Sequence, residues 1–396
     1  MSNFDIYKLP NGLTLLGEPM EGVNSAAFNF MIPAGAAFTP DGCRGGSTVI
    51  SDWIFRGAAS YDSRDLGDAL DSLGLHRNNS VNSYHLNTGA ALEAENMAEA
   101  LKLYADILLR PRLSESQFEP ARQSAIDGVI SLDDDPRSKV MLLLREKFYP
   151  RPLGNIPQGN LKDLESLTPD RTKEIISNCF DISKIILSAA GKYDFDSLCR
   201  QADELFGSEE PGSLREIEAG ERAERYTHIP NGGAQVHIGT MTGTVPPGDR
   251  DYYKARVAVS ILSGGMSARL FTEVREKRGL CYAIGARYHN LKELAGILCY
   301  AGTTPDKAQQ TLDVITGEFR KLADGIDEEE IQRAKVGLKS ALILQSESSG
   351  SRAGAIAGDF FTLGRIRSLD EIKAQIDKIT RKSVLEFLNN HPFRDF

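Results

Sequence analysis

Residues 263–282 read SGGMSARLFTEVREKRGLCY. Arg275 and Tyr282 lie seven positions apart in this stretch, and their guanidinium and phenol groups are hydrogen-bond donors suited to a developing oxyanion. Spacing alone favours a plainer assignment, in which Arg275 is a helix-end cation and Tyr282 a core strand residue. The mixed charges of 276–278 are typical of a solvated surface. Segment 263–267 fits neither phosphate-loop pattern, so it predicts a glycine turn with a structural role.

Composition restricts the classes of function open to the chain. Its 396 residues exceed the length of one typical domain, so two or more domains are expected. The formal charge of -9 and the pI near 5.4 argue against nucleic acid as a main partner, because phosphate backbones are bound by concentrated Lys and Arg. No apolar run is long enough to span a membrane, and the first residues lack the layout of a secretory signal. We therefore expect no nucleic-acid or membrane partner and a cytoplasmic location, or a periplasmic one if a signal was removed.

Cysteine and histidine positions contain no local metal motif. The five cysteines include no C-x-x-C pair, and their odd number fits reduced, buried thiols. The six histidines never fall three or four residues apart, so no helix can present two of them to one metal ion.

The two halves of the chain resemble each other at an offset of about 212 residues. Segments 98–108 (AEALKLYADIL) and 309–319 (QQTLDVITGEF) both carry apolar residues at helical spacing. Each precedes a second helix signal that opens with capping-box spacing, SESQ from Ser114 and DEEE from Asp327. The sequence therefore predicts two copies of one unit.

Strand signals precede these helices in both halves, at 12–16, 25–32, 233–240 and 296–301. Asn11-Gly12 is a hairpin turn signal. Strands grouped with long helices, without strict alternation, predict an α+β fold in which each of two tandem domains is a mostly antiparallel sheet with helices packed on one face. The polar stretch 207–222, with its Gly and Pro residues, predicts a linker between domains at 1–206 and 223–396.

Stretch 263–282 and several shorter matches resemble the pitrilysin or insulinase-type zinc peptidases, the inverzincin family M16. The shorter matches are LPNGLTLL near the start, AGTTPDKA from Ala301 and the EEEIQRAK segment, so the likeness covers nearly the whole chain. It is most similar to the short two-domain bacterial members and to the subunits of mitochondrial processing peptidase. The resemblance implies the M16/LuxS-like metallohydrolase fold.

The family's zinc motif, H-x-x-E-H, is absent from the place where the resemblance puts it. In the family, two histidines bind zinc, the glutamate activates the bound water, and a glutamate about 76 residues later completes the site. Aligned on residues 45–58, GGSTVISDWIFRGA, Thr48 and Asp52 stand at the two histidine positions. Ser51 stands at the general-base position and Gly128 at that of the distal glutamate. The resemblance therefore implies that this chain binds no metal and no other cofactor.

One alternative alignment leaves a carboxylate pair. Asp127 adjoins Gly128, and a slip of one residue would pair Asp52 with Asp127. A catalytic zinc takes three protein ligands, and even this alignment supplies neither a histidine nor a general base.

The resemblance also implies roles in substrate binding. In the family, the residues that match Arg275 and Tyr282 reach the substrate carbonyl beside the zinc, and an extended peptide adds to a sheet edge at the place of 78–85. The substrate-binding residues expected there are Asn78, Asn79, Ser80 and Val81. This segment is rich in Asn and Ser where the family usually has N-A-x-T, so a polar edge protected from aggregation stays open as the alternative.

A chain with the oxyanion donors but without the metal residues is expected to work beside another chain. The leading hypothesis is the non-catalytic subunit of a heterodimeric zinc metalloendopeptidase that acts on peptides, with the zinc held by a partner that has an intact H-x-x-E-H motif. One alternative is an inactive homologue that acts as a scaffold or peptide-binding protein, like respiratory-complex core proteins, including as a homodimer. A third, an independent enzyme with relocated chemistry, finds no second cluster of catalytic residue types in the sequence.

Overall fold

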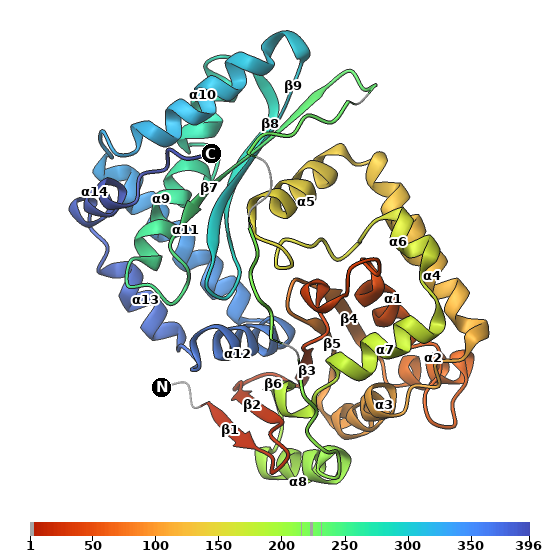
Figure 1. The fold of residues 1–396 in the computed structure, drawn as a ribbon. Helices are drawn as coiled ribbons and strands as arrows, with labels where there is room; N and C mark the ends of the chain where they lie inside the picture. Colours follow the sequence, from red (N-terminus) through yellow and green to blue (C-terminus); the bar gives the residue numbers. More distant parts are fainter. Residues whose placement is uncertain (1–3, 215, 222–224, 231) are drawn as a thin grey trace. The chain divides into compact units, whose positions relative to one another are not determined.

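The computed structural model describes residues 4–214, 216–221, 225–230 and 232–396, and the chain divides into two compact units (Figure 1). The first unit comprises Met1–Ser131, Arg151–Glu221 and Gln345–Phe361, and the second comprises Leu132–Pro150, Arg222–Leu344 and Thr362–Phe396. Each unit has its own sheet with packed helices, so the predicted α+β class is confirmed. Within the described ranges, no helix combines the length and the apolar character needed to cross a bilayer.

This division differs from the expected linear boundaries at two segments. Residues 132–150 group with the second unit, and residues 345–361 group with the first. Positions 215 and 222 of the expected linker 207–222 lie outside the described residues, and the rest of the linker forms no helix or strand. The Gly212 amide donates to the Asp181 carboxylate at 3.0 Å, which holds this stretch against the first unit.

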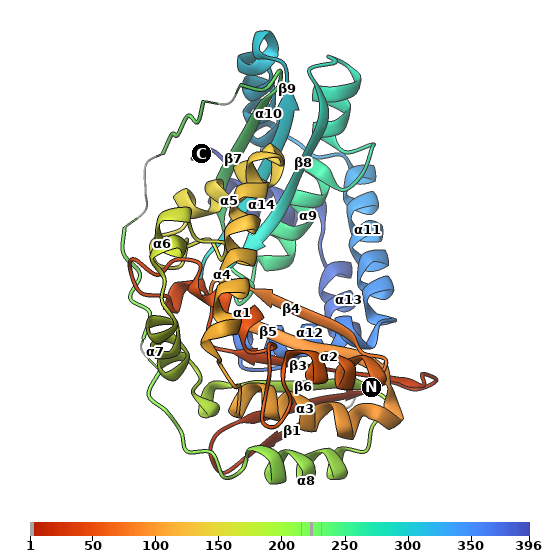
Figure 2. The same ribbon diagram turned by 90° about the vertical axis from the view of Figure 1, so that its right-hand side faces the viewer.

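A six-stranded sheet of order β1-β2-β6-β3-β5-β4 forms the centre of the first unit. Its strands are β1 (Asp5–Lys8), β2 (Thr14–Pro19), β3 (Ser25–Ile32), β4 (His76–Val81), β5 (Leu86–Glu93) and β6 (Ile186–Gly191). Every neighbouring pair is antiparallel except β2 with β6. The Asn11-Gly12 turn joins β1 to β2 as predicted, with Gly12 at a φ of 98°. In Figure 2, β4 and β1 lie at opposite rims of this sheet.

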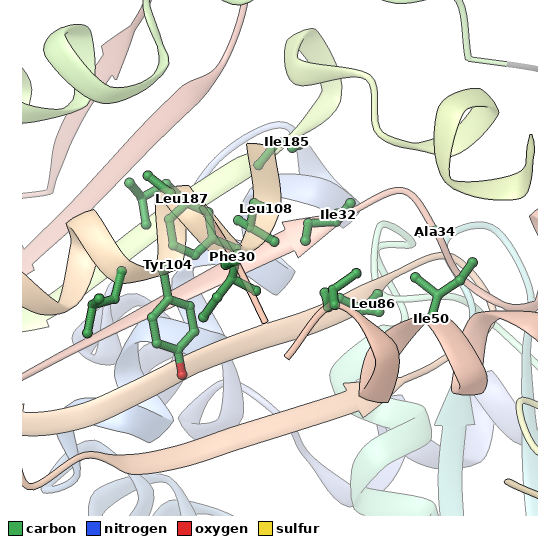
Figure 3. Close-up of a cluster of buried hydrophobic side chains, with 14 of the residues drawn as sticks. Phe30, Ile32, Ala34, Ile50, Leu86, Tyr104, Leu108, Ile185 and Leu187 are labelled. Atoms are coloured by element: carbon green, nitrogen blue, oxygen red, sulfur yellow. The ribbon is translucent and has the colours of Figure 1, made fainter. Parts of the chain in front are cut away.

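The main core of the first unit lies between one face of this sheet and its helices. The helices of the unit are α1 (Gly46–Trp53), α2 (Ser63–Ser72), α3 (Met97–Leu109), α4 (Glu115–Ile130), α6 (Leu161–Ser166), α7 (Pro169–Cys179), α8 (Phe195–Phe206) and most of α12 (Ser349–Leu363). Phe30 and Ile32 alternate along β3 toward Tyr104 and Leu108 of α3 (Figure 3). The stacked Phe30 and Tyr104 rings have centres 6.3 Å apart. Full burial of each such side chain contributes about 1.5–3 kcal/mol.

The opposite face of the first sheet is covered by α12, which comes from the second half of the sequence. Ala27 and Ala190 point to this face and contact Ala353 of α12. Arg352 donates to the Glu18 carboxylate of β2 at 2.7 Å, and both side chains are at least 93% buried, with exposures of 6% and 7%. Small side chains and one buried ion pair therefore hold α12 on the sheet.

The two predicted capping boxes have different outcomes. Ser114 precedes α4, but its side chain makes no capping hydrogen bond, so that box is wrong. At the start of α11 (Glu328–Ser346), the Asp327 amide donates to the Glu330 carboxylate at 2.9 Å, which is the return bond of such a box.

A three-stranded antiparallel sheet of order β7-β9-β8 forms the centre of the second unit. Its strands are β7 (Val236–Thr244), β8 (Cys281–Asn290) and β9 (Ala295–Thr303). The helices of the unit are α5 (Pro136–Phe148), α9 (Tyr252–Ser263), α10 (Ala308–Lys321), most of α11, α13 (Leu369–Asp377) and α14 (Arg381–Asn390). Ile297, Cys299 and Ala301 of β9 point into a core shared with α9, α10 and α14.

The other face of this second sheet is covered by α5, which comes from the first half of the sequence. Glycines on the strands allow the approach, because a side-chain carbon on Gly239 would lie 3.3 Å from Leu144, and one on Gly296 would lie 3.0 Å from Phe148. Tyr149 directly follows α5, and its hydroxyl lies 2.9 Å from Nδ1 of His289 on β8. Each sheet is thus covered on its second face by a helix from the other half of the sequence.

His289 should make the second unit sensitive to acid. Burial, followed by the guanidinium groups of Arg145 and Arg287, lowers the pKa of His289 to about 4. In the unfolded chain the imidazole titrates near 6.5, so between these values only the unfolded state binds the proton, and acidification favours unfolding. The contribution of His289, up to about 3 kcal/mol, is complete above pH 7 and is lost as the pH falls to 4.

Hydrogen exchange of the β8 amides between pH 4 and 8, corrected for intrinsic rates, measures this loss. The variant His289→Gln keeps a hydrogen-bonding amide but does not titrate, and it should lack this part of the pH dependence. The same pH dependence in both proteins would contradict the prediction.

Candidate functional site

Helix α1 carries Thr48, Ser51 and Asp52, the three residues that align with the H-x-x-E-H motif. Gly45 precedes the helix at a φ of 93°, and a side-chain carbon there would lie 2.7 Å from Leu164. Gly159, at a φ of 71°, approaches the Arg44 carbonyl so closely that any side chain would overlap it. Only glycine fits these two positions, so the loop before α6 is held tightly against the start of α1.

The three side chains on α1 already have partners inside the first unit. The Thr48 hydroxyl donates to the Pro157 carbonyl at 2.6 Å, and the Ser51 hydroxyl donates to the Thr48 carbonyl at 2.8 Å. Asp52 accepts from Arg56 at 2.6 and 3.0 Å in a two-bond ion pair. Sequence reasoning missed Arg56, although its position four residues after Asp52 is the spacing of a helical ion pair.

Helix α4 carries the position of the distal glutamate. It packs against α1 through Phe118, whose ring centre lies 4.9 Å from that of Trp53. Gly128 is exposed in the last turn of α4, with open space where a side chain would start. Asp127 accepts from the Gln123 amide at 2.8 Å. Among the described residues, no group of three or more His, Cys, Asp or Glu side chains could hold a metal ion.

The expected peptide-binding edge is β4, the rim strand of the first sheet. The last four residues of β4 are the expected substrate-binding residues Asn78, Asn79, Ser80 and Val81. The strand pairs with β5 on one side, and the side-chain amide of Asn79 donates to the Ser51 carbonyl at 2.5 Å. The remaining expected residues, 82–85, form a turn in which the backbone amides of Tyr84 and His85 donate to the side-chain oxygen of Asn82 at 2.8 Å. The strand edge therefore ends at Val81.

Arg275 and Tyr282 lie together in the second unit. The Arg275 guanidinium carbon, in the π-helical turn η5 (Phe271–Glu276), lies 4.7 Å from the Phe271 ring centre and 5.2 Å from that of Tyr282. Tyr282 sits at a bulge of β8 and is 81% exposed, so it is no core residue. Within the described ranges, the Arg275 side chain makes no hydrogen bond or ion pair. Such stacking contributes about 0.5–1 kcal/mol at exposed sites and leaves the N–H donors available.

The neighbours of this pair have structural roles. Lys277 and Arg278 both bind the Glu273 carboxylate at 2.6 Å, and these bonds lower the pKa of Glu273. In the glycine-rich stretch, the Ser263 hydroxyl accepts from the Ala286 amide of β8 at 2.8 Å. The surface assignment of the charges and the structural assignment of the glycine turn are thus supported.

Comparison with known proteins relates both halves of the chain to one family. Residues 19–156 match the family model described as Insulinase (Peptidase family M16), and residues 166–338 match the one described as Peptidase M16 inactive domain. The chain belongs to peptidase family M16. An "Uncharacterized zinc protease" of Rickettsia bellii is 26% identical to this M16 chain over 393 residues, which cover 98% of the chain and 94% of that protein.

Solved structures share the fold of the M16 chain. A peptidase M16 inactive domain from Pseudomonas fluorescens has a TM-score of 0.89 at 19% identity, over 99% of this chain and 96% of that one. A chain of complex III2 from Candida albicans, with Inz-5 bound, has a TM-score of 0.85 at 18% identity, over 98% and 92%. The family resemblance and the fold predicted from the sequence are both confirmed.

The two units of the M16 chain differ in which polar side chains are available to a ligand. The second unit presents two available donors, Arg275 and Tyr282, whereas the first unit presents hydroxyl and carboxylate groups that are already bound. Sequence reasoning missed a second group of basic residues, Arg145, Arg287 and His289. Its only local signal is that residues 287 and 289 share one face of a strand.

Proposed function

We propose that this M16 chain is the non-catalytic subunit of a heterodimeric zinc metalloendopeptidase, and that it donates Arg275 and Tyr282 to the active site of a zinc-bearing partner. One observation carries the proposal. The Arg275 guanidinium lies 5.2 Å from the exposed Tyr282 ring and has no ion-pair partner among the described residues. A cation held over an aromatic ring, without a carboxylate, is available to an external ligand.

The chemistry of the pair fits peptide hydrolysis. Zinc in the partner would activate water and polarise the scissile carbonyl. The Tyr282 hydroxyl and the Arg275 N–H groups would donate to the carbonyl oxygen as negative charge develops on it. Arginine stays charged at every physiological pH, and its stacking on Tyr282 orients both donors before the substrate arrives.

The donor set of the first unit does not fit a catalytic zinc. Such a zinc takes three protein ligands drawn from His, Cys and carboxylate side chains. Thr48 and Ser51 offer only hydroxyls, and Asp52 is held by Arg56. We therefore propose that this chain binds no cofactor of its own and that the zinc belongs to the partner.

The peptide backbone is proposed to add to the outer edge of β4. An exposed rim strand offers unpaired N–H and C=O groups, and β-augmentation uses these groups regardless of peptide sequence. The bond from Asn79 to the Ser51 carbonyl fixes this strand on α1. Substrate specificity would then arise from side-chain contacts.

Reconstitution tests the proposed function. The purified chain should contain no stoichiometric zinc by metal analysis and should cleave no peptide alone. Mixed with a purified M16 chain that has an intact H-x-x-E-H motif, it should form a heterodimer. The heterodimer should cleave peptide at least a hundredfold faster than that partner alone, because the oxyanion donors are then present. Tightly bound zinc in the lone chain, or a partner that is equally active alone, would contradict the proposal. Assembly without any cleavage would favour the scaffold alternative.

A further inference from the structure

A group of basic and aromatic residues lies between α5 and β8 inside the second unit. Arg145 lies on α5, and its Nη1 is 3.3 Å from Nε2 of His289. The Tyr149 hydroxyl is 2.9 Å from the other ring nitrogen. Arg287 stands two residues before His289 on β8, and alternate strand residues share a face. We call Arg145, Tyr149, Arg287 and His289 the arginine cluster.

Among the described residues, neither guanidinium of the arginine cluster, that of Arg145 or that of Arg287, forms an ion pair with a carboxylate. In the described part of the chain, the exposed side chain of Arg287 makes no hydrogen bond or ion pair, and Nε of Arg145 is buried without a hydrogen-bond partner. Burial, followed by the charge of Arg287, lowers the pKa of Arg145. By contrast, Arg269 of the same unit makes two 2.7 Å bonds to Glu330, and its pKa is raised. The positive charge of the arginine cluster is therefore left for an external anion to neutralise.

Two members of the arginine cluster, Arg287 and His289, lie on β8, the strand that also carries Tyr282. Five residues separate Tyr282 from Arg287, which corresponds to roughly 16 Å of extended strand. An extended peptide advances at the same rate per residue. A ligand that runs along this strand would therefore span both places with about five residues.

We propose that Arg145 and Arg287 form a binding site for a carboxylate of a peptide. Arginine suits this ligand because its planar N–H groups match the two oxygens of a carboxylate. The use of this site for a substrate rests on the proposed function. In a substrate, the carboxylate lies about five residues from the peptide bond that faces Tyr282. Its source is either the C-terminus of the peptide or an acidic side chain.

Binding by the chain alone tests this site without any cleavage. Four versions of one fluorescent decapeptide combine a free or amidated C-terminus with an internal Glu or Gln. At 150 mM salt, at least one version that carries a carboxylate should bind at least tenfold more tightly than the amidated Gln version. Tighter binding through the free C-terminus would identify the C-terminal carboxylate as the ligand, and tighter binding through the internal Glu would identify the acidic side chain. Arg287→Gln should remove this preference, and Arg287→Lys should restore part of it. Arg333→Gln, at an exposed arginine of α11, is the matched control and should keep it.

The imidazole of His289 gives an independent readout in the folded protein. An anion bound to the two guanidinium groups should raise the pKa of His289, so acetate should shift its NMR titration upward, while chloride at equal ionic strength should not. Equal binding of all four peptides by the wild-type chain, or an Arg287→Gln variant that folds and keeps the preference, would overturn the site. Because these assays contain no partner, they stay valid if Arg275 and Tyr282 prove dispensable for cleavage.

Discussion

In the reconstituted heterodimer, replacing Arg275 by alanine and Tyr282 by phenylalanine should lower kcat by at least a hundredfold. Each change removes one donor to the carbonyl oxygen, and loss of one such donor typically costs about 100- to 1,000-fold in kcat. The two donors serve one oxygen and stack on each other at 5.2 Å, so the double variant should lose less than the product of the single losses. Peptide cleavage under saturating substrate measures the effect.

Arg278 provides the matched control for this experiment. It lies three residues after Arg275 and binds Glu273 at 2.6 Å on the surface. Arg278→Ala should change kcat no more than about threefold, because surface ion pairs contribute about 0–1 kcal/mol. Size-exclusion chromatography should show intact heterodimers for every variant. Full activity of the double variant would refute the shared active site and leave the scaffold function as the better explanation.

Arg352→Met should lower the free energy of unfolding of the first unit by about 3–5 kcal/mol. The substitution leaves the Glu18 carboxylate, only 7% exposed, without the cation that balances it, and an uncompensated buried charge has this cost. The only tryptophan of the chain, Trp53, is buried in the first unit. Urea unfolding followed by tryptophan fluorescence therefore reports this unit alone.

Two further variants separate the buried charge from other effects. Arg77→Met breaks an exposed pair with Asp71 in the same unit and should cost no more than about 1 kcal/mol. Glu18→Gln combined with Arg352→Met removes both charges and should recover most of the lost stability, since the penalty comes from the unpaired carboxylate. Equal destabilisation by Arg352→Met and Arg77→Met would contradict the prediction.

The sequence predicted the elements whose signals are local. Segments 98–108 and 309–319 fall inside α3 and α10, because apolar spacing of 3.6 residues depends only on neighbours in the chain. Strand signals at 25–32 and 296–301 fall in β3 and β9 for the same reason. The covering helices α5 and α12 were not predicted as such, because nothing near Ala353 in the sequence indicates that it faces Ala27.

The same limit applies to the candidate sites. Arg275 and Tyr282 are close in the sequence, and their contact follows from a turn between them. Arg145 and Arg287 come from opposite halves of the chain, so no spacing rule relates them. Only the packing of α5 on the second sheet brings them together.

The exchange of covering helices also limits how the gene of this M16 chain could be shortened. Residues 132–150 belong to the first half of the sequence, but α5 covers the sheet that carries Tyr282 and fills the space over Gly239 and Gly296. A gene shortened to the second half would lose this cover and leave one face of that sheet open to solvent. The first half of the gene is therefore needed for the structure of the second unit.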